Sequence, residues 1–79
     1  MTFLKRDVEN KITERQRETY KFIFEFMFKH GYSPSLREIA QGLYISKPVA
    51  KKHLDALIEK GYLSIVPRTA RSITIKKII

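Results

Sequence analysis

Apolar residues recur at helical spacing in three successive segments of the chain. In the first segment the apolar positions fall three and four residues apart, which predicts one buried stripe on a helix. These positions are Tyr20, Ile23, Phe24, Met27 and Phe28. Thr13 and Gln16 form a capping-box pattern at the start, and Gly31 supplies a stop signal. We therefore expect a helix over residues 13–30.

Two shorter helices are predicted further along the chain. Ser35 and Glu38 form a second capping box before residues 36–43, and Ser46 caps a third segment that ends at Gly61. The connection between these two helices is only about three residues long. Their expected buried positions are Leu36, Ile39, Ala40 and Leu43, followed by Ala50, Leu54, Leu57 and Ile58.

The apolar period changes from helical spacing to simple alternation after Gly61, which predicts two strands. The apolar positions of the two strands are Leu63, Ile65, Ile73 and Ile75. The link between them, residues 67–71, is short and basic, so we expect a hairpin. The order of elements predicts a mostly α fold with a small β-hairpin, a winged helix-turn-helix of three helices and a two-stranded wing. It would occupy residues 13–79, after an N-terminal leader at 1–12.

Length and composition exclude several classes of protein. The 79 residues fit one domain, and 43% apolar residues suffice for a thin core. The chain contains no cysteine, and its two histidines, His30 and His53, lack further ligands at metal-binding spacing. No phosphate-binding glycine loop, nucleophile elbow or HExxH motif occurs. We therefore predict no enzymatic activity, no cofactor, no metal and no small-molecule ligand.

The charge balance points to a polyanionic partner. Sixteen lysines and arginines stand against eight acidic residues, a net charge of +8. No apolar run approaches the length of about 18 residues that spans a bilayer, and the first residues lack an apolar signal segment. We therefore expect a cytoplasmic protein without a membrane partner.

Positive charge concentrates on one face of the third predicted helix. At about 100° per residue, five positions in its first turns span an arc of about 140° on the side away from the apolar stripe. They are Lys47, Pro48, Lys51, Lys52 and Asp55. A recognition helix presents such a face to the major groove, where lysines bond guanine or pair with phosphates. Asp55 either accepts a hydrogen bond from cytosine or faces solvent.

Two further patches accompany that helix. Arg68 and Arg71 lie at the two ends of the predicted wing with no acid nearby, and no acidic residue follows Glu59. Such a wing lies along a phosphate backbone or places arginine in a narrow minor groove. The start of the second helix offers free N–H groups, with Ser35 and Arg37, to a phosphate. The sequence thus predicts a cationic saddle that straddles double-stranded DNA.

Four stretches of the chain, taken in order, form a specific set. They are residues 13–16 (TERQ), 31–40 (GYSPSLREIA), 53–61 (HLDALIEKG) and 71–73 (RSI). Together they resemble the N-terminal DNA-binding domain of the LexA repressor family, over about residues 13–75. The resemblance implies a winged helix-turn-helix that reads operator DNA with its third helix and wing. It implies base contacts at Ser46, Pro48, Lys51 and Lys52, and wing contacts in the segment 68–72, which includes Thr69 and Ser72.

The chain departs from that family in several places. The connection 43–47 is about one residue shorter, and Tyr44 occupies a turn position where such motifs often have glycine. Lys51 and Lys52 are not residues that we assume for the family's operators, so no operator sequence is transferred. LexA-like repressors also carry a second domain for dimerisation and self-cleavage. Because 79 residues do not hold that domain, self-cleavage is not transferred either.

The leading hypothesis is a small prokaryotic transcriptional repressor that binds duplex DNA sequence-specifically and associates with the nucleoid. The alternative is a protein-interaction winged helix, an adaptor in a transcription or replication assembly. Phe22 and Phe26 lie off the stripe of the first helix, so they are covered by the leader or form a dimer surface. We leave open a weak homodimer through the leader, through this pair, or through a C-terminal edge strand of Ile78 and Ile79.

Overall fold

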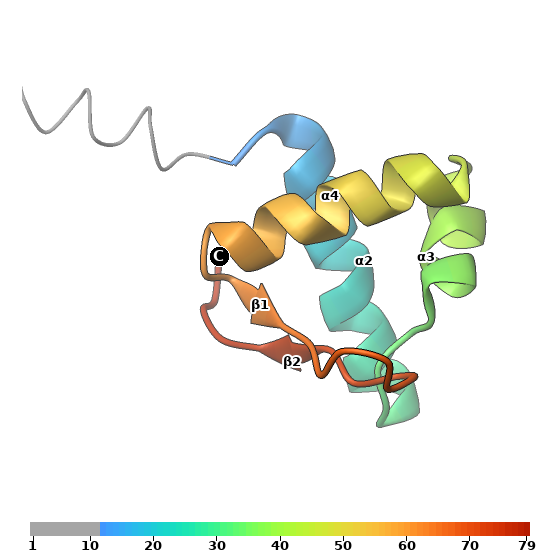
Figure 1. The fold of residues 1–79 in the computed structure, drawn as a ribbon, viewed down its shortest axis with the longest axis vertical. Helices are drawn as coiled ribbons and strands as arrows, with labels where there is room; N and C mark the ends of the chain where they lie inside the picture. Colours follow the sequence, from blue (N-terminus) through green and yellow to red (C-terminus); the bar gives the residue numbers. More distant parts are fainter. Residues whose placement is uncertain (1–11) are drawn as a thin grey trace, which may run out of the picture.

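Three helices and a two-stranded hairpin form the structure, a computed structural model that describes residues 12–79. The helices are α2 (Glu14–His30), α3 (Leu36–Leu43) and α4 (Lys47–Glu59), and the antiparallel strands are β1 (Leu63–Ser64) and β2 (Thr74–Ile75). In Figure 1, α4 crosses α2, α3 lies at the N-terminal end of α4, and the hairpin begins at the C-terminal end of α4 and runs below it. This arrangement is a winged helix-turn-helix, so the predicted fold is confirmed. We call the hairpin loop, residues 65–73, the wing.

Each helix begins where a side chain satisfies its free backbone amides. The Thr13 hydroxyl accepts a hydrogen bond from the Gln16 amide at 3.1 Å, and the Ser35 hydroxyl accepts one from the Glu38 amide at 3.2 Å. In both cases the later side chain accepts a bond from the amide of the cap residue, which completes the capping box. The Ser46 hydroxyl accepts a longer bond of 3.4 Å from the amide three residues on. All three predicted helix starts are therefore confirmed.

The turn between α3 and α4 contains a left-handed tyrosine. Tyr44 has φ 58° and ψ 43°, and its side chain is 95% exposed. Its amide donates to the Gln41 carbonyl at 3.3 Å, and the Ile45 amide donates to the Ala40 carbonyl at 3.0 Å. These two bonds are the pattern that ends a helix with one left-handed residue, usually glycine. The three-residue connection predicted between the helices is confirmed, and a tyrosine takes the glycine conformation in it.

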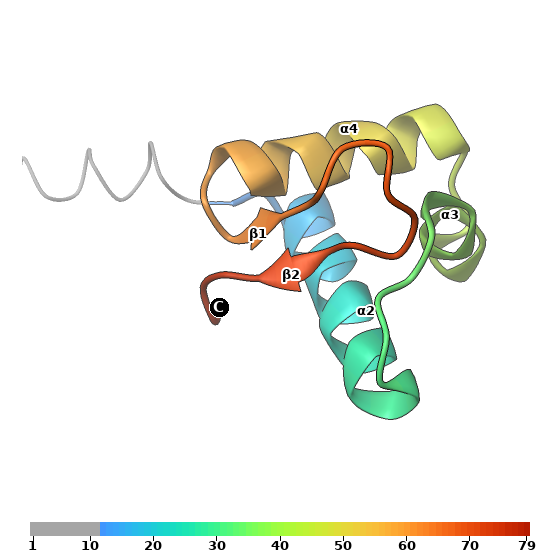
Figure 2. The same ribbon diagram turned by 60° about the horizontal axis from the view of Figure 1, so that its bottom comes forward.

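The core lies where the three helices meet, and β1 closes its open side. It comprises Ile12, Tyr20, Ile23, Ile39, Ala40, Ala50, Leu54, Leu57, Leu63 and Ile73. The stripes predicted for α3 and α4 supply half of this set. The stripe predicted for α2 is wrong at two positions, since Phe28 is 87% exposed and Phe24 39% exposed, whereas Met27 packs against the core. The last turns of α2 extend beyond α4 and the hairpin (Figure 2), and residues 12–79 leave Phe28 largely uncovered there.

Phe22 packs on α3. Gly42 of α3 lies so close that a Cβ atom at that position would overlap the edge of the Phe22 ring. Phe26 continues this packing, with ring centroids 6.0 Å from Phe22, 4.3 Å from His30 and 5.7 Å from Tyr32. The off-stripe aromatics of α2 are therefore partly buried within the domain. Their other expected partner, the leader, lies outside the described residues.

The hairpin ladder is shorter than the alternation predicts. It contains only the pairs Leu63↔Ile75 and Ser64↔Thr74. Beyond them, the Val66 amide donates to the Ser72 hydroxyl at 3.0 Å instead of to a backbone carbonyl. At the base of the wing, a hydrogen bond to a side chain thus takes the place of a backbone hydrogen bond of the ladder.

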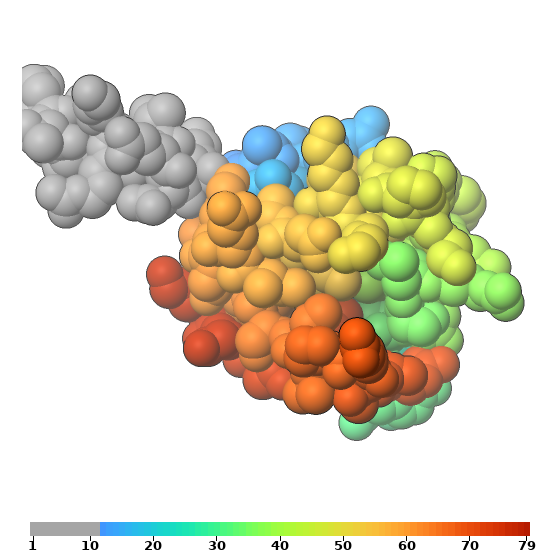
Figure 3. Space-filling view, in the orientation of Figure 1, coloured from blue at the N-terminus to red at the C-terminus, as the bar shows by residue number. Residues whose placement is uncertain are grey.

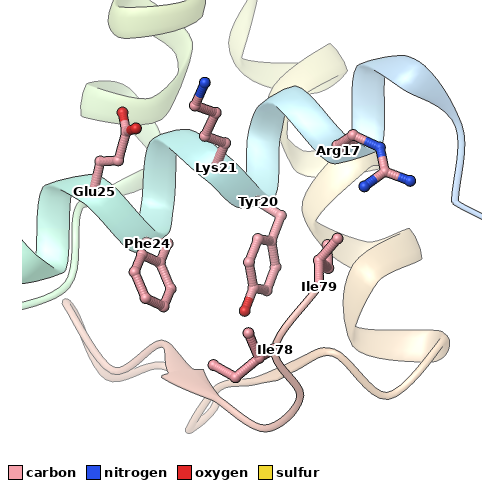
Figure 4. Close-up of a pocket in the computed structure, with 7 residues that line it drawn as sticks. All are labelled: Arg17, Tyr20, Lys21, Phe24, Glu25, Ile78 and Ile79. Carbon is pink, nitrogen blue, oxygen red and sulfur yellow. The ribbon is translucent and has the colours of Figure 1, made fainter.

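The C-terminal tail, residues 76–79, lies against α2. The Tyr20 hydroxyl donates to the Lys77 carbonyl at 2.7 Å. Ile78 and Ile79 face Tyr20 and Phe24 across a groove of about 450 Å³ (Figure 4). Residues 76–79 form no strand within this chain, and pairing of two copies through Ile78 and Ile79 stays a prediction.

Candidate nucleic-acid interface

The outward face of α4 carries the predicted basic residues. Ala50, Leu54 and Leu57 are buried on one side of the helix. The exposed positions on the other side are Lys47, Pro48, Lys51, Lys52 and Asp55. The helix runs from Lys47 to Glu59, so the three lysines and Pro48 occupy its N-terminal half and Asp55 lies one turn further on. The prediction that a basic face turns away from the core is confirmed, whereas contact with DNA stays a prediction.

One of these lysines has an acidic neighbour. Lys51 Nζ lies 3.0 Å from Asp55 Oδ2, one helical turn on, and the two side chains are 62% and 54% exposed. An exposed pair of this kind contributes about 0.3–0.5 kcal/mol to stability. A phosphate can therefore compete with Asp55 for the Lys51 ammonium group. Within residues 12–79, Lys47 and Lys52 make no such ion pair.

The phosphate patch expected at the start of α3 is smaller than predicted. The Ser35 amide donates to Glu38 Oε1 at 2.8 Å, and the Ser35 hydroxyl accepts from the Glu38 amide. These two amides are therefore not free for a ligand. Arg37 is exposed and remains the cation of this patch.

The wing is closed by Ser72 and presents Arg68 and Thr69 outward. The Ser72 hydroxyl oxygen lies 3.1 Å from the Val66 carbonyl and 2.9 Å from the Thr69 carbonyl, and it also accepts from the Val66 amide. Ser72 thus acts inside the wing, whereas Arg68 and Thr69 are exposed at its tip. Arg68 has a left-handed φ of 62°.

Arg71 has an acidic partner, contrary to the prediction. Its Nη1 and Nη2 atoms donate to Glu38 Oε1 at 2.8 Å and Oε2 at 3.1 Å. Nη1 also donates to the Ser33 carbonyl at 3.1 Å, and the guanidinium carbon lies 4.8 Å from the centre of the Tyr32 ring. The hydrogen bonds from Arg71, followed by that from the Ser35 amide, lower the pKa of Glu38 from its ordinary 4.5 to about 2. Glu38 in turn raises the pKa of Arg71.

The three elements that carry these residues share one face of the molecule. In Figure 3, the outer surface of α4 lies above the wing, and α3 lies beside both. The figure colours α4 yellow to orange, the wing orange to red, and α3 green. A surface of this kind offers one helix flanked by two further patches, which is the arrangement that a winged helix presents to duplex DNA.

Comparison with known proteins identifies the family. The sequence profile of the LexA DNA binding domain matches residues 9–72. The chain belongs to this family. The LexA repressor of Thermotoga maritima is 46% identical over 68 residues, which cover 86% of this chain and 34% of that protein. LexA repressor 2 of Geobacter sulfurreducens is 43% identical over 65 residues, 81% of this chain and 32% of that protein.

A further relative is LexA repressor 2 of Pseudomonas putida, 40% identical over 63 residues, which cover 78% of this chain and 31% of that protein. The chain thus spans about a third of the length of the curated LexA relatives that it matches. The resemblance to the LexA family predicted from the sequence is confirmed. Within residues 12–79, no helix has the length and apolar character needed to cross a membrane.

The role of Glu38 in this LexA DNA-binding domain escaped the sequence analysis. The sequence pattern explains Glu38 locally, as the second half of the capping box with Ser35. Its partner Arg71 lies 33 residues away. Helical and strand periodicity relate residues within one element, so they do not indicate a contact over this separation. Tyr32 and Ser33 carry no signal either, because they act through a ring face and a backbone carbonyl.

Proposed function

We propose that this chain binds double-stranded DNA sequence-specifically as the DNA-binding part of a transcriptional repressor. The observation that carries the proposal is the outward basic face of α4 in a helix-turn-helix of the LexA DNA-binding domain family. The names of its relatives, LexA repressors, support repression as the outcome of binding. Such a protein acts on the nucleoid, in the cytoplasm. The proposed contact residues are Arg37, Ser46, Lys47, Pro48, Lys51, Lys52, Arg68 and Thr69.

The physical basis is the match between α4 and the major groove. A helix with its side chains is about 10–12 Å across, and the major groove is about 12 Å wide. Lys47, Lys51 and Lys52 lie on the part of α4 that would enter the groove first. Their ammonium groups can donate to guanine O6 and N7 or pair with the flanking phosphates. The wing would then lie on the backbone or in the adjacent minor groove, with Arg68 as its exposed cation.

The experiment is a titration of labelled duplexes selected from a random pool, with charge-reversed variants. Lys51→Glu combined with Lys52→Glu should weaken binding by about 100-fold or more, because two groove contacts become repulsive. The control is Lys21→Glu with Lys29→Glu on α2, both exposed, which changes the net charge equally. Circular dichroism checks that each variant is folded. Equal losses for both pairs, or no binding by the wild type at low salt, would contradict groove reading and point to a protein-interaction adaptor.

The same titration reports how many copies bind. One helix-turn-helix covers one half-site, and pairs bind half-sites about 34 Å apart. We propose that two copies occupy such sites with weak contact between them. The exposed apolar residues of the tail side, Phe24, Phe28 and Ile78, are better candidates for that contact than Phe22, which packs on α3. Selected sites that contain a single half-site, bound by one copy, would contradict pairing.

A further inference from the structure

We propose that Arg71 is a positioning residue that fixes the wing on the helix-turn-helix, and that Arg68 is the wing cation that contacts DNA. The inference rests on the DNA-binding function proposed above. We call the group formed by Arg71, the Glu38 carboxylate, the Ser33 carbonyl and the Tyr32 ring the clamp.

The wing has few backbone restraints of its own. Only two residue pairs form the ladder beneath it. Arg68 and Arg71 both have left-handed backbone angles, with φ of 62° and 54°, and no glycine lies in the wing to relieve them. Each such residue costs about 1–2 kcal/mol. The Ser72 hydroxyl closes the wing internally, but it sets no orientation relative to the helices.

The clamp supplies that orientation. The bidentate pair between Arg71 and Glu38 fixes the plane of the guanidinium group, and two parallel N–H···O bonds give more geometric definition than a single ionic contact. The Ser33 carbonyl takes a third bond, and the Tyr32 ring covers one face. The Ile73 amide adds a buried bond of 3.2 Å to the Ser33 hydroxyl at the base of the wing. The wing is thus tied to the segment that leads into α3.

The clamp connects the wing to the helix-turn-helix because Glu38 serves both. One oxygen of Glu38 accepts the Ser35 amide that starts α3, and the same carboxylate accepts Arg71. Three of the five N–H groups of this guanidinium are already bonded within the protein, so the minority remain for a phosphate. Arg68, by contrast, is exposed, and no acidic side chain within residues 12–79 pairs with it. The two arginines of the wing therefore have different roles.

The test is a double-mutant cycle in DNA affinity and in its salt dependence. Arg68→Ala should reduce the slope of log affinity against log salt by about 0.9, the effect of one phosphate contact, and weaken binding about fivefold at 0.15 M salt. Arg71→Ala should give a similar loss, because the wing no longer holds Arg68 in place. The double variant should lose no more than Arg68→Ala alone. Additive losses, with the slope falling by about 1.8, would show that Arg71 contacts DNA itself and would overturn the proposal.

Glu38→Gln separates positioning from charge. Glutamine keeps the capping box, and the variant removes a negative charge near the proposed DNA surface. Simple electrostatics therefore predicts tighter binding, whereas loss of the clamp predicts binding about three- to tenfold weaker. Glu25→Gln on α2 makes the same change in net charge away from the clamp and should not weaken binding. Tighter binding by Glu38→Gln would overturn the proposal.

A measurement without DNA distinguishes failure of the inference from failure of the proposed function. In the free protein, nuclear Overhauser contacts between the wing and the start of α3 should be present in the wild type and reduced in Glu38→Gln. Unchanged contacts would overturn the clamp whatever the DNA result. Reduced contacts in a protein that binds no duplex would retain the clamp and overturn DNA binding, and with it the role of Arg68.

Discussion

Tyr44 carries a conformational cost that its side chain does not recover within the domain. It adopts φ 58° at the end of α3, yet it is 95% exposed and so gains little from packing. A non-glycine residue in this region costs about 1–2 kcal/mol, mainly because of its Cβ atom. The surrounding hydrogen bonds of Ile45 and the packing of the two helices hold it there.

Replacing Tyr44 with glycine should therefore stabilise the free domain. The relief of backbone strain exceeds the loss of about 0.5–1 kcal/mol that comes from the greater freedom of glycine in the unfolded chain. We expect a net gain of about 0.5–1 kcal/mol in the free energy of unfolding, measured by urea denaturation. Tyr44→Ala keeps the Cβ atom and should give no gain. An equal gain with alanine would mean that the tyrosine ring, and not the backbone, is unfavourable.

The Glu38 carboxyl predicts a pH dependence of stability. Its pKa is lowered from 4.5 to about 2 in the folded protein, chiefly by the hydrogen bonds from Arg71. At a pH between these values the unfolded chain binds more protons at this position than the folded chain. The stabilisation by ionised Glu38 is thus fully present above about pH 4.5 and is lost as the pH falls towards 2.

The measurement is the difference in melting temperature between the wild type and Glu38→Gln as a function of pH. The wild type should be more stable from pH 7 down to about pH 5, and the difference should shrink to zero near pH 2. Glu25→Gln should show no comparable shrinking difference. A Glu38→Gln difference that stays constant across this range would contradict the charge-assisted pairing of Glu38.

At the scale of elements, the close approach of α3 to α2 depends on Gly42. A Cβ atom at this position would overlap the Phe22 ring. Although alanine favours a helix by about 1 kcal/mol over glycine, overpacking costs about 1–3 kcal/mol. Gly42→Ala should therefore destabilise the domain by about 1 kcal/mol, measured by urea denaturation. Combined with Phe22→Ala, it should cost less than the sum of the single effects. Additivity would mean that the two residues are not in contact.

The helices were predictable because the signals that start and end them are local. Thr13, Ser35 and Ser46 cap the amides of residues three positions on, so their helices begin within one residue of the predicted starts. The basic face of α4 was predictable because burial follows helical periodicity. The lengths of the strands were less predictable. The Val66 amide bonds to the Ser72 hydroxyl instead of to a backbone carbonyl, and the alternation of apolar residues does not indicate this bond.

The parts that sequence reasoning missed depend on contacts between distant segments. Arg71 pairs with Glu38, which lies 33 residues away in the sequence, and Phe28 is 87% exposed because the described residues that pack on the last turns of α2 contact other sides of the helix. Neither fact has a signature within one element. The apolar pattern of a single helix predicts which side of the helix faces inward. How many turns of that side are buried depends on the neighbouring elements.

At the scale of the whole molecule, the net charge of +8 gives salt two opposite effects. Raising salt from about 0.02 to 0.2 M should weaken duplex binding steeply, because counterions released from DNA into a more concentrated salt solution gain less entropy. It should also stabilise the free domain by about 0.5 kcal/mol, or about 2–4 °C in melting temperature, by screening self-repulsion. Fluorescence anisotropy and thermal unfolding in the same buffers measure both. A fall in melting temperature, or an affinity insensitive to salt, would contradict this account.

The short ladder and side-chain closure of the wing have a consequence for engineering. The attachments lie at its base, through Ser72, Arg71 and Ile73, while the segment 67–70 is exposed and carries no long-range hydrogen bond. Extra residues inserted between Thr69 and Ala70 would disturb the local bond from the Ser72 hydroxyl to the Thr69 carbonyl, but they would extend the loop while the bonds of Arg71 and Ile73 to the segment before α3 stay in place. A graded series of such insertions offers a way to vary how far along a flanking groove the protein reaches while the three helices keep their arrangement.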